Sequence, residues 1–337
     1  MAHSLIISSL LSGGLITNYY CTSSCAHCLY RCSPLWPKKF IDVTTAREQL
    51  TIIKNLGCQS IHIGGGEPFL NPDALISVLD EAAKAKIAIQ YVETNSSWFQ
   101  RLDNACELLQ EISKRGVRAL LVSISPFHNE YIPFYKVKGV IDSCKKTGIA
   151  VNAWTWDFFE EIDSLDDKET HSLTEFSNRF GEDYISRIPC RYWISPGGRA
   201  LDTFSKVSSR ITVPALLSRF KEGCSELASV SHFHVDLFGN YIPGLCAGLS
   251  IKSEDLGKTL DSDKYPLLTL LFNQGVKGLF RMAMEEYGFE PRKALYFNKC
   301  ELCFEIRKYL VCSANLKSAE LCPHEHYTLS RKSSIHE

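Results

Sequence analysis

The sequence predicts an α/β fold built on a parallel sheet, and two patterns support this prediction. Short apolar stretches with the composition of strands alternate with segments of helical periodicity, and several of those segments end at a glycine. Strands that alternate with helices in this way imply βα units, whose strands lie parallel to one another. The length of 337 residues suits one large domain, or one large domain with a small appendage.

The expected elements follow an apolar run over residues 15–20. Strand candidates are short and apolar, whereas helix candidates have apolar residues three and four positions apart. In chain order the prediction is helix 41–56, strand 60–63, helix 73–86, strand 87–93, helix 101–115, strand 117–125, helix 129–147 and strand 149–156.

Composition indicates a soluble cytoplasmic enzyme. The formal net charge is −1 and 45% of residues are hydrophobic, so no global charge favours nucleic acid or a membrane surface and a packed core is possible. No apolar run reaches the roughly 20 residues that cross a bilayer. The N-terminus lacks a basic region and contains Gly13-Gly14, which argues against a signal peptide. Fourteen cysteines in a reducing compartment point to metal or redox chemistry, because disulfides are rare there.

Three cysteines near the start are the most informative residues. Cys21, Cys25 and Cys28 form a C-x3-C-x2-C loop directly after the apolar run. Three thiolates can hold three irons of a [4Fe–4S] cluster and leave the fourth iron open, whereas clusters that only carry electrons are normally held by four cysteines. Structural zinc also takes four ligands, and His27 is poorly placed to complete such a site. The spacing therefore favours chemistry at a cluster.

A glycine-rich segment follows the strand over residues 60–63. It reads Gly64-Gly65-Gly66-Glu67-Pro68, and glycines at a strand end allow the backbone to approach a ligand closely. Together with the cysteine loop, this Gly-Gly-Glu-Pro segment resembles the radical S-adenosylmethionine (SAM) enzymes. The resemblance implies a partial TIM barrel of six βα units, with the chemistry at the carboxyl ends of the strands.

The resemblance also implies which residues bind SAM. The open iron would chelate the amino and carboxylate groups of the methionine part of SAM, and His27, in place of the usual aromatic residue, would lie near the adenine. Polar residues at the strand ends are further candidates for contact with the ribose, the carboxylate or the adenine, although each could equally cap its strand. The expected SAM-binding residues are His27, Gly64, Gly65, Gly66, Glu67, Pro68, Glu93, Thr94, Asn95, Ser123, Ser125 and Asn152.

Two residues are candidates for catalysis. His128 follows the fourth strand and could orient substrate or transfer a proton, because imidazole titrates near neutral pH; it could also be an ordinary loop histidine. Cys190 is a candidate hydrogen donor to a substrate radical.

The C-terminal part resembles the twitch or SPASM extension of radical SAM enzymes. Residues 232–243 alternate around a Gly-Asn turn and predict a β-hairpin, and Cys300 and Cys303 begin an amphipathic helix. The pattern Cys-x14-Gly-x6-Cys followed by C-x2-C would give one auxiliary [4Fe–4S] cluster the ligands Cys224, Cys246, Cys300 and Cys303. The gap from the glycine to the second cysteine is longer than usual.

Alternatives to a single auxiliary cluster stay open. A second cluster would need four more ligands, drawn from Cys190, Cys312, Cys322 and a histidine, but Cys312 and Cys322 lack the tight spacing of a SPASM domain. Zinc fits two cysteine pairs equally well. The expected division is a radical SAM partial barrel over residues 1–210 and an auxiliary-cluster domain over residues 211–337.

The resemblance implies an activity but not a substrate. A reduced cluster would cleave SAM to a 5′-deoxyadenosyl radical, which removes a hydrogen atom from the substrate. The expected reaction is modification of a peptide or protein by crosslinking, epimerisation or oxidation. The alternatives are oxidation or rearrangement of a small metabolite, and a non-catalytic iron–sulfur or zinc protein. A flavodoxin or ferredoxin would donate electrons, and an oxygen-sensitive cluster indicates an anaerobic or microaerobic cell.

Overall fold

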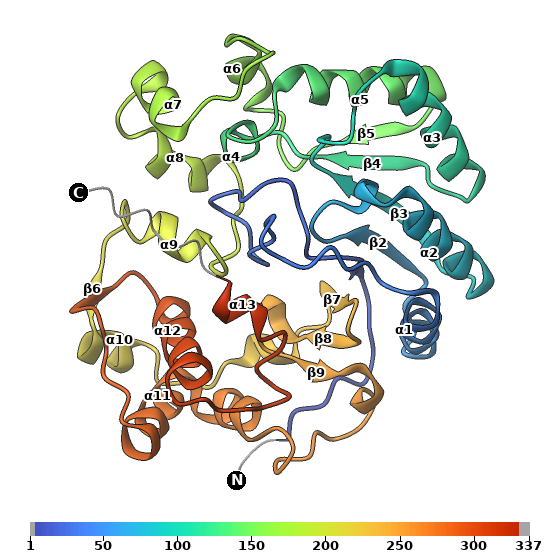
Figure 1. Ribbon diagram of the computed structural model, residues 1–337. Coiled ribbons are helices and arrows are strands. Elements are labelled where there is room, and N and C mark those ends of the chain that lie inside the picture. The colour runs from blue at the N-terminus through green and yellow to red at the C-terminus, as the bar shows by residue number, and fades with distance from the viewer. Residues whose placement is uncertain (1–3, 330–337) are drawn as a thin grey trace.

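The computed structural model describes residues 4–329 and has an eight-stranded sheet at its centre (Figure 1). Strands β1 to β5 and strand β7 run parallel, whereas β8 and β9 are antiparallel to their neighbours. The order across the sheet is β5-β4-β3-β2-β1-β7-β8-β9. Its strands are β1 (Gly13–Ile16), β2 (Ser60–Gly64), β3 (Ala88–Thr94), β4 (Ala119–Val122), β5 (Ala150–Asn152), β7 (Phe233–Asp236), β8 (Asn240–Ile242) and β9 (Ile251–Lys252).

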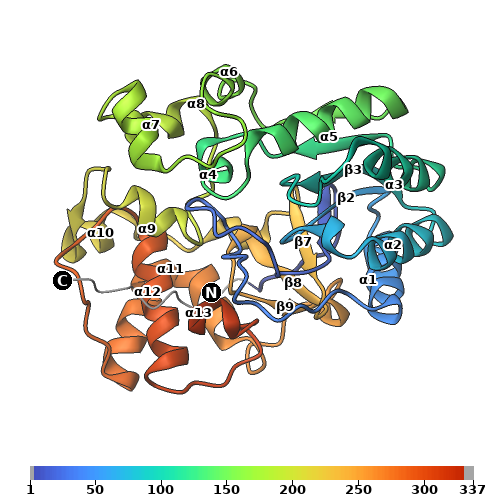
Figure 2. The ribbon, with the colours of Figure 1, turned by 45° about the horizontal axis from the view of Figure 1, so that its top comes forward.

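Helices join the parallel strands and cover the outer face of the sheet (Figures 1 and 2). They start and stop at residues with clear physical reasons: Asp42 and Asn71 cap their helices by accepting hydrogen bonds from backbone N–H groups, and Gly148 ends α5 with φ of 73°, a conformation that glycine adopts without strain. These helices are α1 (Val43–Asn55), α2 (Pro72–Lys84), α3 (Leu102–Lys114) and α5 (Phe134–Thr147).

The α/β fold with a parallel central sheet, predicted from the alternation of elements, is confirmed. Two predicted strands are shorter than expected, since the fourth ends at Val122 and the fifth covers only residues 150–152. A short helix, α4 (Pro126–Asn129), precedes α5, because a proline at the first helical position favours a new helix start.

The sixth parallel strand comes from an unexpected part of the chain. Between residues 153 and 210 the described chain contains helices but no strand, and the sheet is instead extended by β7, which pairs with β1. The sheet therefore runs without a break from the N-terminal barrel into the C-terminal region. The intervening helices are α6 (Phe159–Asp163), α7 (Leu173–Phe180), α8 (Tyr184–Arg191) and α9 (Ala200–Phe204).

The C-terminal region packs as a helical layer beside the barrel (Figures 1 and 2). The predicted hairpin is confirmed as β7 and β8, and the predicted helix that begins with two cysteines is confirmed as α12. A two-stranded sheet of β6 (Ile211–Thr212) and β10 (Leu295–Tyr296) closes the region. Its helices are α10 (Val213–Arg219), α11 (Pro266–Tyr287), α12 (Lys299–Cys312) and α13 (Glu325–Thr328).

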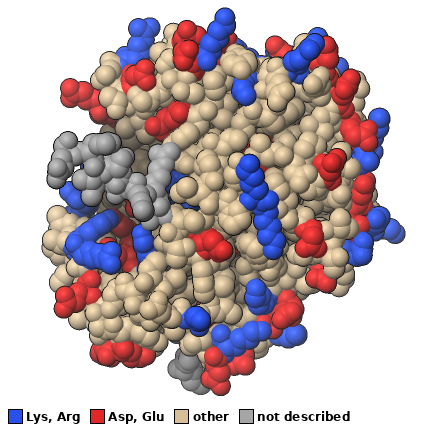
Figure 3. All heavy atoms as spheres, viewed as in Figure 1, with Lys and Arg blue, Asp and Glu red and all other residues tan. Residues whose placement is uncertain are grey.

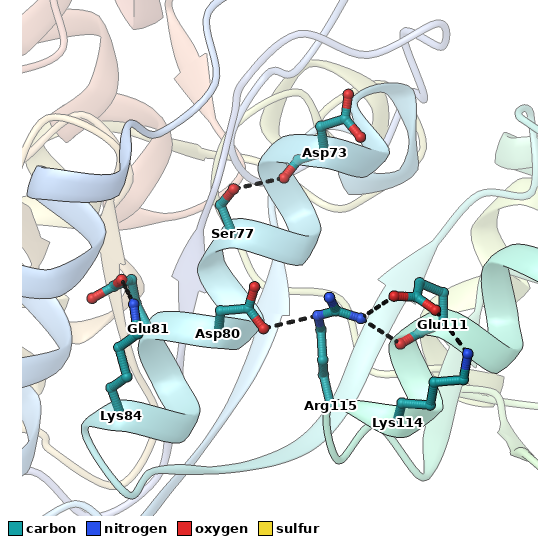
Figure 4. Close-up of polar contacts among 8 residues, drawn as sticks. All are labelled: Asp73, Ser77, Asp80, Glu81, Lys84, Glu111, Lys114 and Arg115. Carbon is teal, nitrogen blue, oxygen red and sulfur yellow. Dashed lines mark hydrogen bonds and ion pairs between the residues drawn. The ribbon is translucent and has the colours of Figure 1, made fainter.

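The outer helices are joined by surface ion pairs. Arg115, just after α3, donates from Nε to Asp80 of α2 over 2.8 Å and also pairs with Glu111 (Figure 4). Lys84 and Lys114 pair with acidic residues three positions earlier in their own helices. Exposed pairs of this kind contribute only about 0–1 kcal/mol each, so the apolar core beneath them stabilises the packing of α2 and α3.

On the face shown in Figure 3, charged side chains do not gather into one acidic or one basic patch. Figure 3 shows acidic and basic side chains intermixed around the edge of one face, while the middle of that face is mostly uncharged. Among the described residues, no helix is both long and apolar enough to cross a membrane.

Candidate functional site

A cavity of about 230 Å³ lies at the carboxyl ends of the parallel strands. The segment between β1 and α1, dark blue in Figure 1, crosses the centre of the molecule and carries the cysteine loop to this cavity. The cavity is lined by Cys21, Ser23, Cys25, His27, Cys28, Leu29, Tyr30, Cys32, Gly65, Gly66, Glu93, Thr94, Asn95, Ser123, His128, Trp154, Tyr192, Trp193, Ile194, Ser195, Arg199, His232, His234 and Leu245.

The cysteine loop is held by its own backbone. The N–H of Cys21 donates to the carbonyl of Ser33 over 3.3 Å, and the N–H of Cys28 donates to the carbonyl of Cys25 over 3.1 Å. Cys21 and Cys25 are buried and Cys28 is half-buried. All three thiols of the predicted motif therefore face one cavity from one compact loop.

The glycine segment packs directly against the residues that precede this loop. The N–H of Gly66 donates to the carbonyl of Asn18 over 2.7 Å, and Gly65 has φ of 133°. A Cβ at position 66 would lie 1.9 Å from the carbonyl oxygen of Tyr20, which is a steric clash. Glycine is required here because the strand end and the cysteine loop are pressed together, which explains why both motifs occur in one chain.

Glu67 supports the site from behind and does not line the cavity. Its carboxylate accepts hydrogen bonds from the N–H of Asn95 over 2.6 Å, from the N–H of Phe69 over 3.1 Å and from the Thr94 hydroxyl over 3.1 Å. Burial outweighs these bonds and raises the pKa of Glu67 to about 7. The residue ties the end of β3 to the glycine segment.

The end of β3 contributes three polar residues to the cavity, as the sequence predicted for a strand end. Asn95 donates from its side-chain amide to the sulfur of Cys21 over 3.3 Å. Burial raises the pKa of Glu93 to about 7, with a further contribution from the Cys28 thiolate. Glu93, Thr94 and Asn95 all line the cavity beside the cysteine loop.

His27 and His128 contact each other in the wall of the cavity. The ring of His27 stacks on Phe127 at 4.6 Å and meets the ring of His128 edge-on at 4.9 Å. Nδ1 of His128 forms a 2.7 Å hydrogen bond with the hydroxyl of Ser125, and burial lowers the pKa of His128 to about 4. A neutral imidazole in this place can orient a ligand or accept a proton.

Six of the predicted SAM-binding and catalytic residues lie outside the cavity lining: Glu67 and Ser125, described above, and Gly64, Pro68, Asn152 and Cys190. Asn152 and Cys190 are exposed at the end of β5 and in α8. Gly64 and Pro68 are buried at the two ends of the glycine segment. A Cβ at Gly64 would lie 2.5 Å from the Glu93 carboxylate. Ser123 does line the cavity.

The charge balance of the cysteine loop fits an iron–sulfur cluster. Burial raises the pKa of Cys21 to about 12 and raises that of Cys25 well above its ordinary value, while a hydrogen bond with Cys32 lowers the pKa of Cys28 to about 5. The guanidinium of Arg199 is the cation that acts on all three thiols. Cys21 and Cys25 would therefore ionise only beside a further cationic centre, and the irons of a cluster are such a centre.

Sequence reasoning missed the brace on the other side of the loop. Arg199 donates to the carbonyls of Cys25 over 2.8 Å and Cys32 over 2.7 Å, and Thr203 donates to the carbonyl of Ala26 over 2.6 Å. A Cβ at Gly198 would lie 2.3 Å from the carbonyl of Cys28. The signal in the sequence was the Pro-Gly-Gly-Arg segment over residues 196–199, which matches neither helical nor strand periodicity.

Four cysteines of the C-terminal region form a second cluster of thiols. Cys300 and Cys303 lie about one turn apart at the N-terminal end of α12. Burial, with repulsion from the neighbouring sulfurs, raises the pKa of Cys224 to about 12 and of Cys300 to about 11. Burial, together with repulsion from Cys300, Cys303 and Cys224, raises the pKa of Cys246 well above its ordinary value. The structure thus brings together all four residues predicted for an auxiliary cluster.

Two basic residues accompany these thiols. Nζ of Lys299 is 4.0 Å from the sulfur of Cys224, and the positive charge of the buried Arg307 guanidinium acts on Cys303 and Cys246. Leu245, next to Cys246, lines the central cavity. The second cluster therefore carries its own positive charge and adjoins the first site.

The chain was compared with known proteins by sequence and by structure. Residues 15–158 match the family described as the Radical SAM superfamily, and this region contains the cysteine loop, the glycine segment and strands β2 to β5. The similarity to the radical SAM superfamily therefore covers residues 15–158, less than half of the chain. Radical SAM enzymes bind a [4Fe–4S] cluster and SAM, and the three-cysteine loop with its glycine cradle fits both groups.

Individual relatives are more distant. A GTP 3′,8-cyclase of Microcystis aeruginosa is 32% identical over 110 residues, which is 32% of this chain and 32% of that protein. The chain thus spans about a third of the length of that curated relative.

Two solved structures resemble the fold at low identity. The structure of native anSMEcpe with bound AdoMet is 16% identical, covers 89% of this chain and 97% of its own, and has a TM-score of 0.46. The structure of Streptococcus suis SuiB bound to precursor peptide SuiA is 13% identical, covers 94% of this chain and 75% of its own, and has a TM-score of 0.34.

Proposed function

We propose that this radical SAM enzyme modifies a peptide or protein by removing a hydrogen atom from one of its residues. When bound, the cluster and SAM supply the 5′-deoxyadenosyl radical that performs this step, and the protein orients the reactants and excludes water. Residues Cys21, Cys25 and Cys28 would hold the cluster, and the Gly65-Gly66 backbone with Glu93, Thr94 and Asn95 would hold SAM.

The cavity mouth is the observation that carries the choice of substrate. Trp193 is 69% exposed and Trp154 is 55% exposed, and both line the cavity beside Tyr192. Large exposed aromatic side chains are unusual on a free surface and are typical of sites that bind peptides or proteins. This rim supports an extended substrate that reaches past the opening.

The proposed division of labour follows the two cysteine sites. Residues 1–210 would perform SAM chemistry, and residues 211–337 would hold one auxiliary [4Fe–4S] cluster of the twitch type on Cys224, Cys246, Cys300 and Cys303. Support for one cluster rather than two comes from the remaining cysteines: Cys190 and Cys312 are exposed, and the charges that act on Cys322 come from lysine and carboxylates. We propose a cytoplasmic enzyme that receives electrons from a flavodoxin or ferredoxin.

A small-molecule substrate is the second candidate, because the curated relative is by its name a cyclase of GTP. A triphosphate needs several cations. Arg199 is the one lysine or arginine among the described residues that line the cavity, and it is already bonded to two loop carbonyls. The lining therefore favours a substrate without phosphates.

The experiment combines SAM cleavage with a search for the product. We expect anaerobically reconstituted protein with dithionite to form 5′-deoxyadenosine, and the Cys21→Ala/Cys25→Ala/Cys28→Ala variant to form none. The protein and this variant are then expressed in cells grown on deuterated amino acids, together with short reading frames that neighbour the gene. Deuterium in 5′-deoxyadenosine and a changed peptide mass with the active protein support the proposal. Deuterium transfer from a labelled metabolite instead would favour the second candidate.

A further inference from the structure

We propose that His62, His232 and His234 form a binding site for a divalent transition-metal ion of the zinc type, separate from both cysteine sites. One nitrogen from each imidazole lies within 4.8 Å of the others, and Nε2 of His62 and Nε2 of His234 are 2.9 Å apart. Two nitrogens at about 2.0–2.1 Å from a tetrahedral zinc ion lie about 3.3 Å apart, so the two rings would separate by a few tenths of an ångström to hold the ion. The rings come from β2 and from the start of β7, which are far apart in sequence.

The register of the sheet brings the rings together. His62 on β2 and His234 on β7 are both paired with Gly14 of the strand between them. A Cβ at position 14 would lie 2.2 Å from Nε2 of His62. Glycine at this position leaves room for two imidazoles to meet over β1, and no other residue type could do so without moving them.

Neighbouring side chains fix the orientation of the rings. The hydroxyl of Tyr30 forms a 2.8 Å hydrogen bond with Nδ1 of His234, which directs Nε2 toward His62. The ring of His62 is stacked between those of Tyr91 at 5.0 Å and His232 at 5.3 Å. Metal-binding histidines are normally held through their other ring nitrogen, as His234 is here by Tyr30.

The available ligands suit a cation. Oε1 of Glu93 is 3.9 Å from Nε2 of His62, so a carboxyl group lies beside the three imidazoles. Binding of an ion would replace the proton that Nε2 of His62 and Nε2 of His234 share over 2.9 Å. Three imidazoles with one carboxylate are a ligand set that zinc, iron(II) and similar ions prefer.

A hydrogen bond between His62 and His234 alone does not account for the position of His232. His62 and His234 can satisfy each other with one shared proton, but His232 forms no hydrogen bond within the described part of the chain, although it is half-buried against both rings. A bound ion gives the third imidazole a partner.

The site faces the same cavity as the cysteine loop, because His232, His234 and Glu93 line it. An ion held here would have a coordination position toward the cavity, where an oxygen or nitrogen of the substrate could bind. This last step rests on the proposed function, whereas binding of the ion does not.

Zinc content and zinc coordination test the site on the full chain. Protein with its cysteine sites filled by reconstitution is equilibrated with zinc, desalted and analysed for metal. We expect about one zinc per chain, and X-ray absorption showing nitrogen and oxygen at about 2.0–2.1 Å without sulfur at about 2.3 Å. His232→Asn and His234→Gln should each lose this zinc, whereas His171→Asn, at a histidine outside the cavity, should keep it.

Two results would overturn the proposal: zinc no higher in the wild type than in His232→Asn, or a zinc shell that contains sulfur. Iron content and thermal midpoint are measured on every variant to detect misfolding. If His234→Gln does not fold, His232→Asn decides the question, because His232 precedes β7. SAM cleavage measured on the same samples separates failure of the metal site from failure of the proposed enzyme.

Discussion

The two cysteine sites differ in what surrounds their sulfurs. The loop cysteines have three thiols, one guanidinium, and a cavity lined by backbone, hydroxyl and carboxyl groups. The C-terminal cysteines have four thiols with Lys299 and Arg307 beside them. A four-thiolate cluster has no open iron and needs compensating charge, whereas a three-thiolate cluster keeps one iron for a ligand. The difference indicates chemistry at the first site and electron transfer or structural support at the second.

Iron counting gives the largest expected effect. Reconstituted wild type should hold about eight irons per chain, and removal of either cysteine set should leave about four, because each set would hold one four-iron cluster. Cleavage of SAM should be abolished by Cys21→Ala/Cys25→Ala/Cys28→Ala, but should persist in Cys300→Ala/Cys303→Ala, which lacks only the auxiliary cluster.

The exposed residue Cys312 provides the control, since Cys312→Ser should change neither iron content nor cleavage. A wild-type count of about four that falls to none in the loop variant would show that the C-terminal thiols hold zinc or no metal. The proposed redox role of the second site would then be wrong.

The contrast between the sites also explains what the sequence could predict. The loop cysteines and the pair in α12 are close along the chain, so their spacing alone predicts a shared metal. The parallel sheet was predictable from alternating periodicity for the same local reason. Arg199 was not, because its contacts with the loop cross more than 160 residues of chain, and its segment has no regular pattern.

The histidine cluster shows the same limit. Its members meet only because β7, rather than a strand from residues 153–210, pairs with β1. No periodicity in the chain specifies which strand pairs with β1, since that choice depends on packing across the whole domain. Contacts that depend on strand order can therefore be identified only from the structure.

A smaller effect is expected at the brace of the loop. Arg199→Ala removes two hydrogen bonds from a charged donor to loop carbonyls, each contributing roughly 1.5–3 kcal/mol. The first cluster should then lose iron faster in air, while the second cluster is unaffected. Arg199→Lys should lie in between, because an ammonium cannot span both carbonyls as the guanidinium fork does.

The measurement is the decay of visible cluster absorbance, made in the Cys300→Ala/Cys303→Ala background so that only the loop cluster contributes. The exposed Arg118, whose guanidinium bonds only to Ser113, is the matched control as Arg118→Ala. Equal decay in Arg199→Ala and Arg118→Ala would contradict the bracing role.

The smallest effect concerns the pH dependence of stability in the barrel. Glu67 has a folded pKa of about 7 against an ordinary value of 4.5, so between these values the folded chain binds its proton more tightly than the unfolded chain does. The free energy of unfolding should therefore be highest below pH 4.5 and fall as pH rises through about 7, by at most about 3 kcal/mol. Glu67→Gln cannot ionise at this position, so its free energy of unfolding should lose this part of the dependence on pH.

Denaturant unfolding of wild type, Glu67→Gln and the exposed control Glu107→Gln from about pH 5 to about pH 8 measures how the free energy of unfolding changes with pH. Parallel curves for wild type and Glu67→Gln would mean that the hydrogen bonds from Asn95, Phe69 and Thr94, rather than burial, set the ionisation of this carboxyl group.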